Sequence, residues 1–275
     1  MKRLHGQTVS VITTAYNAGK FIGQTIHSIL QQDYEYFEYI IVDDGSNDDT
    51  VEVIKRFSDA KLRLIEAGRI GRGQALNLAI KESKGNYIAI QDADDLSHPQ
   101  RLSIQIECLN QKVHLLGTKE TLFQNGDPMK WEKVPHPPNF HEMITDVTGT
   151  LVYYNPIPHT SVMMSRELVD RVGGYNEKRK NLFDWDLYIR TAASGYRIHK
   201  LPLPLVGKRL HKSQFFENKK RMSYVYNSSK LQLRAAFFCC RNPFCVLSLP
   251  ILFVYRLFPN KGRMAIRKYL RLSGK

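Results

Sequence analysis

The eight residues YIIVDDGS (39–46) join a short apolar run to an abrupt polar end. The run is rich in Ile and Val, which is typical of a strand buried on both faces of a sheet. Two further runs, TVSVIT (8–13) and YIAI (87–90), have the same character, and polar residues follow each of them, at 14–17 and 91–95. The sequence therefore predicts three buried strands whose carboxyl ends carry polar side chains.

Segments with helical spacing separate these strands. They cover residues 21–31, 49–57 and 73–82, and a fourth strand is predicted at 62–65. Strands that alternate with helices predict an α/β fold of the Rossmann type, with a mainly parallel sheet and helices on both faces. Because ligands of such sheets bind outside the carboxyl ends of the strands, the three polar ends are expected to form one site.

The charge of the chain is divided unevenly. The 275 residues carry a formal net charge of +14, but residues 208–275 contain sixteen Lys and Arg against one acid, a net +15. Residues 1–207 carry 24 basic and 25 acidic residues, a net −1. The basic excess thus belongs to the C-terminal part, and because no module that reads nucleic acid is recognisable, no nucleic-acid partner is expected.

The cysteines and the N-terminus indicate a compartment. The four cysteines lack the spacing of zinc ligands, and three of them lie in one apolar stretch. We therefore expect no disulfide framework, which fits a reducing environment. The first residues contain no apolar segment long enough for a signal peptide. Together these features predict a cytoplasmic protein.

Asp92, Asp94 and Asp95 crowd three carboxylates onto the turn after the strand 87–90. Such a cluster repels itself unless a cation offsets the charge. Mg²⁺ and Mn²⁺ prefer carboxylate oxygens and commonly share their coordination shell with substrate phosphates. The motif favours a metal–diphosphate site, although acids also follow strands in plain surface turns.

Asp43 and Asp44 allow two interpretations. An acid at a strand end can help to cap the next helix, as Ser46 or Asn47 could also do. It can equally accept a hydrogen bond from a nucleobase N–H or a ribose hydroxyl, while Tyr16 stacks on the base. These residues alone leave both interpretations open.

The chain resembles the family 2 glycosyltransferases of the GT-A fold in four segments, which are in order VSVITTAYNAGKFI, EYIIVDDGSNDDT, GRGQALNLAI and GNYIAIQDADDLSHPQRL. The resemblance is close over residues 1–110 and continues in pieces to residue 213. It implies an inverting enzyme of the bacterial polysaccharide type. It also implies a nucleotide diphosphate sugar as donor, with UDP as the expected carrier, and Mn²⁺ or Mg²⁺ as cofactor.

The resemblance implies donor-side roles for individual residues. Thr14 and Tyr16 match the loop that flanks the nucleobase, and Asp44, beside Asp43, matches the carboxylate that reads the base. Arg72 lies near a family position whose basic residue faces the base or the phosphates.

In the acidic turn, Asp94 and Asp95 match the pair that contacts the ribose and the metal, and Asp92 completes the DxD motif. One departure concerns the glycine loop, since Arg69 stands where the family usually has Asn. The role of that loop is therefore not implied by the resemblance.

The acceptor side resembles the family in NPIPHTSVMMSRELVDRVGGYNE (155–177) and in FDWDL (183–187). The second segment matches a Glu-Asp-x-Asp-Leu motif whose second position, here Asp184, supplies the catalytic base. Its first position departs from the motif, because Phe183 replaces an acid. Asp186 points in a different direction from Asp184 on a helix, so a structural role is expected for it.

Four further residues have weaker signals. Trp185 could stack on a sugar, although a core position is more common for Trp, and His159 could lie near the acceptor or serve as a loop hydrogen-bonder. Arg209 and His211 resemble an Arg-x-His element that closes over donor phosphates in related enzymes.

The predicted organisation is a catalytic domain of residues 1–213, with a nucleotide-sugar half (1–110) and an acceptor half (111–213), and a helical basic and apolar tail (214–275). The fourteen uncharged residues 242–255 would span about 21 Å as a helix, against about 30 Å of hydrocarbon, so a transmembrane span is not expected. Apolar residues interleaved with Lys and Arg instead favour binding to an anionic membrane surface at the inner face of the cell membrane. Packing of the tail on the domain is the alternative.

Two other functions remain as alternatives. A sugar nucleotidyltransferase would need a glycine-rich phosphate loop, but TAYNAGK (14–20) has one glycine. A basic membrane- or polyanion-binding protein with a degenerate transferase domain is opposed by the intact acids of the motifs. For a transferase, the expected acceptor is a hydroxyl of a glycan or a lipid-linked glycan.

Overall fold

The computed structural model describes most of the chain. The described residues are 7–109, 112–124, 129–131, 134, 139–211, 221–239 and 244–257. The predicted domain boundary near residue 213 lies outside them, so the division into 1–213 and 214–275 stays a prediction.

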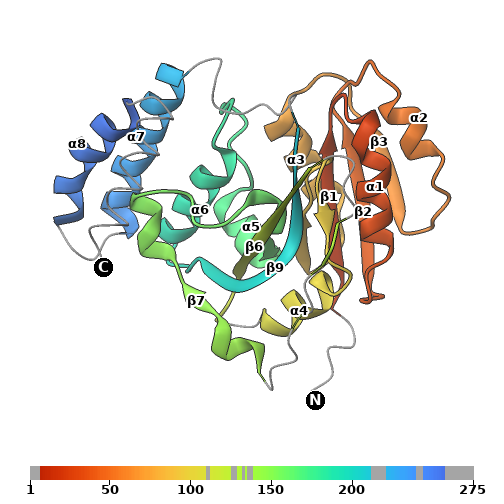
Figure 1. Ribbon diagram of the computed structural model, residues 1–275, viewed down its shortest axis with the longest axis horizontal. Coiled ribbons are helices and arrows are strands. Elements are labelled where there is room, and N and C mark those ends of the chain that lie inside the picture. The colour runs from red at the N-terminus through yellow and green to blue at the C-terminus, as the bar shows by residue number, and fades with distance from the viewer. Residues whose placement is uncertain are drawn as a thin grey trace.

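A large sheet forms the centre of the molecule (Figure 1). Among the described residues its strand order is β3-β2-β1-β4-β8-β6-β9-β5, and β7 pairs with β9. The strands are β1 (Val9–Ala15), β2 (Phe37–Asp43), β3 (Leu62–Glu66), β4 (Tyr87–Ile90), β5 (Leu96–Ser97), β6 (Leu115–Gln124), β7 (Thr145–Asp146), β8 (Met163–Ser165) and β9 (His199–Leu210).

The strands β1 to β4 are parallel to one another and lie where the sequence predicts them. β6 also runs parallel to β9. These pairings confirm the predicted α/β fold with a mostly parallel central sheet. The antiparallel strands β5, β7 and β8 are additions that the sequence does not predict.

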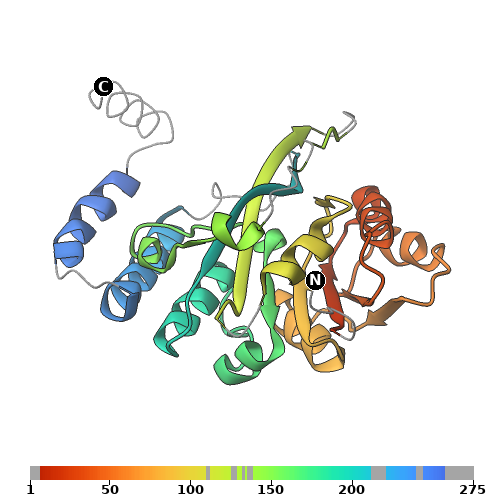
Figure 2. The ribbon, with the colours of Figure 1, turned by 90° about the horizontal axis from the view of Figure 1, so that it is seen from below.

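Helices cover both faces of the sheet (Figure 2). Alternate residues of β2 show why its apolar run is continuous, since Tyr39 and Ile41 pack with α1 and α4, and Ile40 and Val42 pack with α3, α5 and α6. The helices are α1 (Gly19–Leu30), α2 (Thr50–Lys55), α3 (Arg72–Glu82), α4 (Arg101–Cys108), α5 (Arg166–Val172) and α6 (Phe183–Ala193). A strand with two apolar faces therefore seats two helical layers.

Two C-terminal helices lie at the side of the molecule opposite α2 (Figure 1). α7 (Arg221–Cys239) packs on α6 and on the 3₁₀ helix η2 (Thr148–Val152), and α8 (Phe244–Leu257) packs on α7. The predicted helical appendage is thus present. Among the helices that the structure describes, none combines the length and the apolar content needed to cross a membrane.

Candidate active site

The loops after β1, β2 and β4 meet at one edge of the sheet. The amide of Asp44 donates to Ala15 O at 2.8 Å, and the Thr13 hydroxyl donates to Gln91 O at 2.9 Å. These bonds hold the three polar strand ends side by side, as the topology of a parallel sheet requires. Thr14 is half-buried at the end of β1, in register with Val42.

Asp43 is used by its own turn. Its carboxylate accepts the amide protons of Gly45 and Ser46 at 3.1 and 2.9 Å, and it accepts the Ser46 hydroxyl at 2.5 Å. The side chain is 3% exposed. In this geometry Asp43 shapes the loop that presents Asp44, and its oxygens face the turn.

Asp44 is buried beneath the loop 69–71. Its Oδ1 accepts the amides of Ile70 at 2.8 Å and Gly71 at 2.6 Å, and its Oδ2 forms an ion pair with the Arg69 guanidinium. The guanidinium carbon lies 3.6 Å from the centroid of the Tyr16 ring, so Arg69 also covers that ring. Arg69 therefore joins the two residues that the sequence assigns to a nucleobase.

Arg72 occupies the first turn of α3 and points at the acidic turn. Its Nη2 donates to Asp92 Oδ1 at 2.5 Å and to His159 Nδ1 at 3.3 Å. His159 Nε2 lies 2.8 Å from the hydroxyl of Tyr175. Burial opposes ionisation of Asp92, but Arg72 and His159 outweigh it, so the pKa of this carboxyl lies below its ordinary value.

Asp94 and Asp95 contact the end of β9. Asp94 Oδ2 lies 2.8 Å from His211 Nε2, while Asp95 Oδ1 accepts the amide of Arg209 at 3.0 Å. Asp95 is 3% exposed, and burial, followed by the charges of Asp92 and Asp94, raises its pKa well above the ordinary value. Asp94 is therefore the acid of this pair that faces outward.

Arg209 fixes the backbone of the same turn. Its Nε donates to Asp94 O at 2.8 Å and its Nη2 donates to Gln24 Oε1 at 2.7 Å. Its guanidinium lies between the rings of Phe21 and Phe123, at 4.9 and 4.6 Å from their centroids. Arg209 is thus buried and connects the Arg-x-His element to the backbone of the acidic turn by hydrogen bonds.

A buried arginine behind the acidic turn is missed by the sequence reading. Arg101, at the start of α4, is fully buried, and its guanidinium donates to Gln91 Oε1, Ser97 Oγ and Ile90 O at 2.8 to 2.9 Å. Burial lowers its pKa to about 9, so it stays cationic at neutral pH. Since Arg is seldom fully buried, only its position six residues after the acidic turn could have drawn attention to it.

Asp184 lies in the first turn of α6. Asn155 Nδ2 donates to its Oδ2 at 2.5 Å, and the Trp185 amide donates to its Oδ1 at 2.8 Å. The residue before the helix, Leu182, has a φ of 55°, a left-handed conformation that is unfavourable for Leu. The backbone strain at this position is consistent with a constrained functional turn.

The neighbours of Asp184 on α6 have other roles. Trp185 is 2% exposed and donates to Leu151 O at 3.0 Å, so it is a core residue. Phe183 packs against the same core. The hydroxyl of Tyr188, one turn after Asp184, is buried and has no hydrogen-bond partner among the described residues. Sequence reasoning does not single out Asn155 or Tyr188.

Asp186 is fully buried at the junction of α6 and α7. Arg190 Nε donates to its Oδ2 at 2.8 Å, Arg234 Nη1 donates to its Oδ1 at 3.1 Å, and Arg179 lies at 3.5 Å. These contacts give Asp186 a structural environment and attach α7 to α6.

The acidic turn and the start of α6 both act on Arg72. Asp92 raises the pKa of its guanidinium, and Asp184 and Asp94 raise it further. Arg72 therefore pairs directly with Asp92, and the charges of Asp184 and Asp94 also act on its guanidinium.

The acidic turn offers a partial set of ligands for a metal ion. Among the described residues, no group of three or more His, Cys, Asp and Glu side chains forms a complete metal site. Asp94 and His211 nevertheless bring a carboxylate oxygen and an imidazole nitrogen within 2.8 Å of each other. This partial set fits a cation whose remaining ligands come from a diphosphate and water.

Comparisons with known proteins agree with this geometry. The sequence model of the family described as "Glycosyl transferase family 2" matches residues 10–173. The glycosyltransferase EpsE of Bacillus subtilis (strain 168) is 30% identical over 230 residues, which cover 81% of this chain and 78% of EpsE. TuaG of the same organism, named for teichuronic acid biosynthesis, is 27% identical over 247 residues, with 84% and 92% covered.

Solved structures share the fold. S. aureus TarS (residues 1–349) in complex with UDP-GlcNAc has a TM-score of 0.67 and 19% identity, covering 90% of this chain and 72% of TarS. The mannosyltransferase PcManGT from Pyrobaculum calidifontis, in complex with GDP-Man and Mn²⁺, has a TM-score of 0.62 and 18% identity, covering 99% and 82%. With the family match over more than half of the chain, the protein belongs to glycosyltransferase family 2 and is a glycosyltransferase of the GT-A fold.

Proposed function

We propose that this glycosyltransferase moves a sugar from a UDP-sugar, with inversion, to a hydroxyl of a glycan or a lipid-linked glycan. The observation that carries the proposal is the ion pair of Arg72 with Asp92 of the acidic turn, at 2.5 Å, together with the charge of Asp184 that acts on the same guanidinium. A guanidinium held between the acidic turn and the candidate base can bind the donor diphosphate beside the group that activates the acceptor.

The nucleotide would bind at the ends of β1 and β2. Tyr16 is 45% exposed and offers a ring face for the base, and the buried Asp44 offers a carboxylate for a base N–H. Thr14 lies near the end of β1, and Tyr16 follows directly after this strand. Asp43 holds the loop that carries Asp44 in shape.

The diphosphate and its metal would lie at the acidic turn. Asp94 and His211 would hold Mn²⁺ or Mg²⁺, and Asp95 beside them would anchor the backbone of Arg209. When bound, the cation supplies Lewis-acid stabilisation of the negative charge on the departing nucleotide diphosphate. Arg72 and Asp92 would orient the phosphates from the α3 side.

Asp184 would act as the general base. An inverting transfer needs a carboxylate that takes the proton of the acceptor hydroxyl while that oxygen attacks the anomeric carbon. Asn155 fixes Oδ2 of Asp184 through its amide, so the carboxylate is oriented before substrate binds.

The test is release of free nucleotide from a panel of UDP-, GDP- and dTDP-sugars, with Mn²⁺ or Mg²⁺ and with EDTA. We expect turnover of one donor that depends on metal and is lost in Asp95→Ala and Asp94→Ala, but kept in Asp59→Ala, a surface control in the turn before β3. Turnover without metal would overturn the metal assignment. Absence of both turnover and metal-dependent donor binding would favour the non-catalytic alternative, and formation of a nucleotide sugar from sugar phosphate would favour a nucleotidyltransferase.

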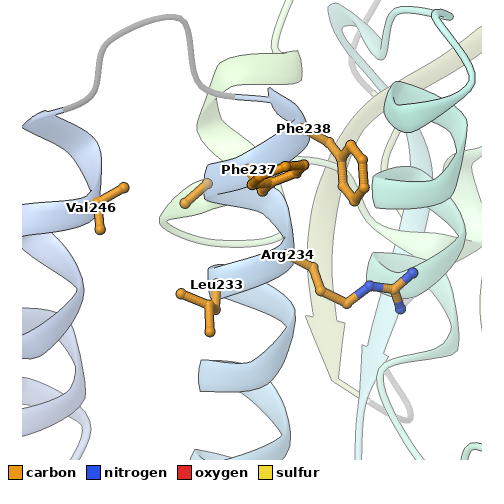
Figure 3. A pocket seen from close by; sticks show the side chains of 6 residues that line it. Leu233, Arg234, Phe237, Phe238 and Val246 are labelled. Atoms are coloured by element: carbon orange, nitrogen blue, oxygen red, sulfur yellow. The ribbon is translucent and has the colours of Figure 1, made fainter.

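We also propose that the C-terminal helices hold the enzyme on an anionic membrane surface. α7 and α8 form a groove of about 440 Å³, lined mainly by apolar side chains, and Figure 3 shows Leu233 and Phe237 of α7 pointing to the side on which Val246 of α8 lies. Several apolar residues of the two helices are strongly exposed: Leu233, Phe237, Leu247, Ile251 and Val254. Their combination with the net +15 of residues 208–275 matches a negatively charged leaflet and supports a peripheral location at the inner membrane face.

Flotation with vesicles tests this surface. Deletion of residues 214–275 is expected to abolish binding to vesicles with phosphatidylglycerol, but it also removes core residues of α7 such as Leu231. The sharper variant is Phe237→Ser with Leu247→Ser, compared with Leu122→Ser, an exposed apolar residue of β6. We expect only the double variant to lose vesicle binding. Equal flotation of both variants, or binding only to a protein partner, would overturn the membrane proposal.

A further inference from the structure

Arg69 covers both groups that a nucleobase would use. Its guanidinium is planar and carries N–H donors on its edge, as a pyrimidine carries its ring N–H. It stacks on Tyr16, 3.6 Å from the ring centroid, and pairs with Oδ2 of Asp44. The side chain of Arg69 thus has the stacking face and the hydrogen-bond direction of a bound base.

The loop that carries Arg69 does not depend on this side chain. The amides of Ile70 and Gly71 donate to Oδ1 of Asp44, which leaves Oδ2 for the guanidinium. Gly45 has a φ of 72°, and a Cβ there would lie 2.8 Å from the Arg69 backbone nitrogen. The backbone of the loop is therefore seated on Gly45 and Asp44 whether or not the Arg69 side chain stays in place.

Two oxygens of one carboxylate thus have different partners. Oδ1 is held by backbone amides, while Oδ2 is held by a side chain that is 57% exposed. The guanidinium returns to water when the pair opens, whereas Asp44 is only 4% exposed, so Oδ2 needs another donor in place of Arg69. Oδ2 is the oxygen that can change partner.

We propose that Arg69 occupies the nucleobase position of the donor-free enzyme and that the base of the donor displaces it. The ring N–H of uracil, thymine or guanine then takes over Oδ2 of Asp44, and the base takes the ring face of Tyr16. This inference rests on the proposed nucleotide-sugar function. It makes Arg69 the residue that sets the cost of donor binding at the base.

Calorimetry with UDP and Mg²⁺ tests the displacement. We expect Arg69→Ala to bind UDP about two- to fivefold more tightly than the natural chain, since an exposed ion pair no longer has to open. Arg69→Lys keeps the charge without the planar group and should lie between the two. Arg63→Ala is the matched control, because Arg63 is a half-exposed arginine paired with Glu82 away from the loop.

Uridine separates the base from the phosphates. Uridine lacks the diphosphate and needs no metal. In saturation-transfer NMR with uridine, the natural chain, Arg69→Lys and Arg69→Ala should therefore rank in the same order of affinity as they do with UDP. Weaker UDP binding by Arg69→Ala would mean that Arg69 contacts the bound donor, and equal binding would mean that it does not stand in the way. Either result overturns this inference alone. Failure of all variants, including the natural chain, to bind any nucleotide would overturn the proposed function as well.

Discussion

Two regions of the molecule hold carboxylates against arginines in opposite ways. At the donor edge, formed by the ends of β1, β2 and β4 with the start of α3, Asp44 and Asp92 each pair with one arginine; these arginines are 57% and 44% exposed, and the acids are 4% and 27% exposed. At the α6–α7 interface, Asp186 has no exposed surface and lies among three arginines, which are 19%, 21% and 48% exposed. The two regions therefore differ in how many arginines hold each carboxylate.

The difference separates exchangeable pairs from structural ones. A carboxylate with a single, half-exposed arginine partner can exchange that partner for a ligand, because water solvates the released cation and the ligand takes its place at the carboxylate. A carboxylate sealed among cations cannot lose one partner without leaving uncompensated charge in the interior. We therefore expect ligands to compete with the arginines for Asp44 and Asp92 at the donor edge, and not for Asp186. Asp186 thus differs in its expected role from Asp184, which stands only two residues before it on the same helix.

The largest expected effect is a loss of activity when Asp184, but not its neighbour Asp186, is the group that takes part in the reaction. Asp184→Asn should lower kcat by about 10²–10⁴-fold, the range for loss of a general base, while the folded structure is kept because Asn can still accept the Asn155 amide. Steady-state kinetics and a thermal melt measure the two quantities. A variant with normal kcat would remove Asp184 from the reaction.

The second effect appears in stability. Asp186→Ala should lower the free energy of unfolding by about 3 kcal/mol, at the low end for a broken buried pair because Arg190 and Arg179 keep some exposure. Urea titration measures the change in the free energy of unfolding. Glu167→Ala on α5 is the control, because it removes an exposed acid and should change this free energy less. Loss of activity with unchanged stability would contradict the structural role of Asp186.

The third effect tests which acid of the turn faces the cation. Asp94→Asn should weaken the metal that supports turnover by roughly 10–100-fold, because its carboxylate faces His211. Asp95→Asn should change the metal dependence less, since its Oδ1 is already bonded to the Arg209 amide. The comparison is made by titrating Mn²⁺ into each apo variant, and the reverse order would move the ligand to Asp95.

The sequence predicts the donor half well for a physical reason. The runs at 8–13, 39–42 and 87–90 form β1, β2 and β4, because strands covered on both faces need mainly apolar residues, and the run at 62–65 forms the edge strand β3. The polar residues after them meet because parallel strands end at one edge. Their individual roles at the site stay predictions.

The strands of residues 111–213 are harder to predict from the sequence, because β9 contains residues that are unusual in a strand. Pro202 and Pro204 lie within it, and a proline lacks the N–H that a strand needs. The pairing with β6 shifts between Thr118 and Lys119, where Leu201 is followed by Pro204 as the next partner, so the sheet accommodates the prolines at an irregularity. Contacts across long separations, such as Arg69 on Tyr16 or Asn155 on Asp184, carry no local pattern at all.

The smallest effect concerns the exchangeable pair of Asp92 with Arg72. Burial opposes ionisation of Asp92, but Arg72 and His159 outweigh it and hold the pKa below the ordinary value, so the folded state releases this proton more readily than the unfolded state. The resulting stabilisation is complete above the unfolded pKa of about 4 and is lost as the pH falls through the folded pKa. Since Asp92 is 27% and Arg72 44% exposed, we expect about 1 kcal/mol or less.

Asp92→Asn removes this contribution and makes the pair measurable. The stability difference between the natural chain and the variant should be constant from pH 7 to pH 5 and should shrink as the pH falls towards 3, as followed by urea unfolding at each pH. Ionic strength should shrink it as well, because the pair is screened by salt, whereas the cost of Asp186→Ala should be nearly unaffected. A difference that grows on acidification, or that resists salt as the Asp186 cluster does, would place Asp92 among the structural carboxylates and erase the distinction between the two regions.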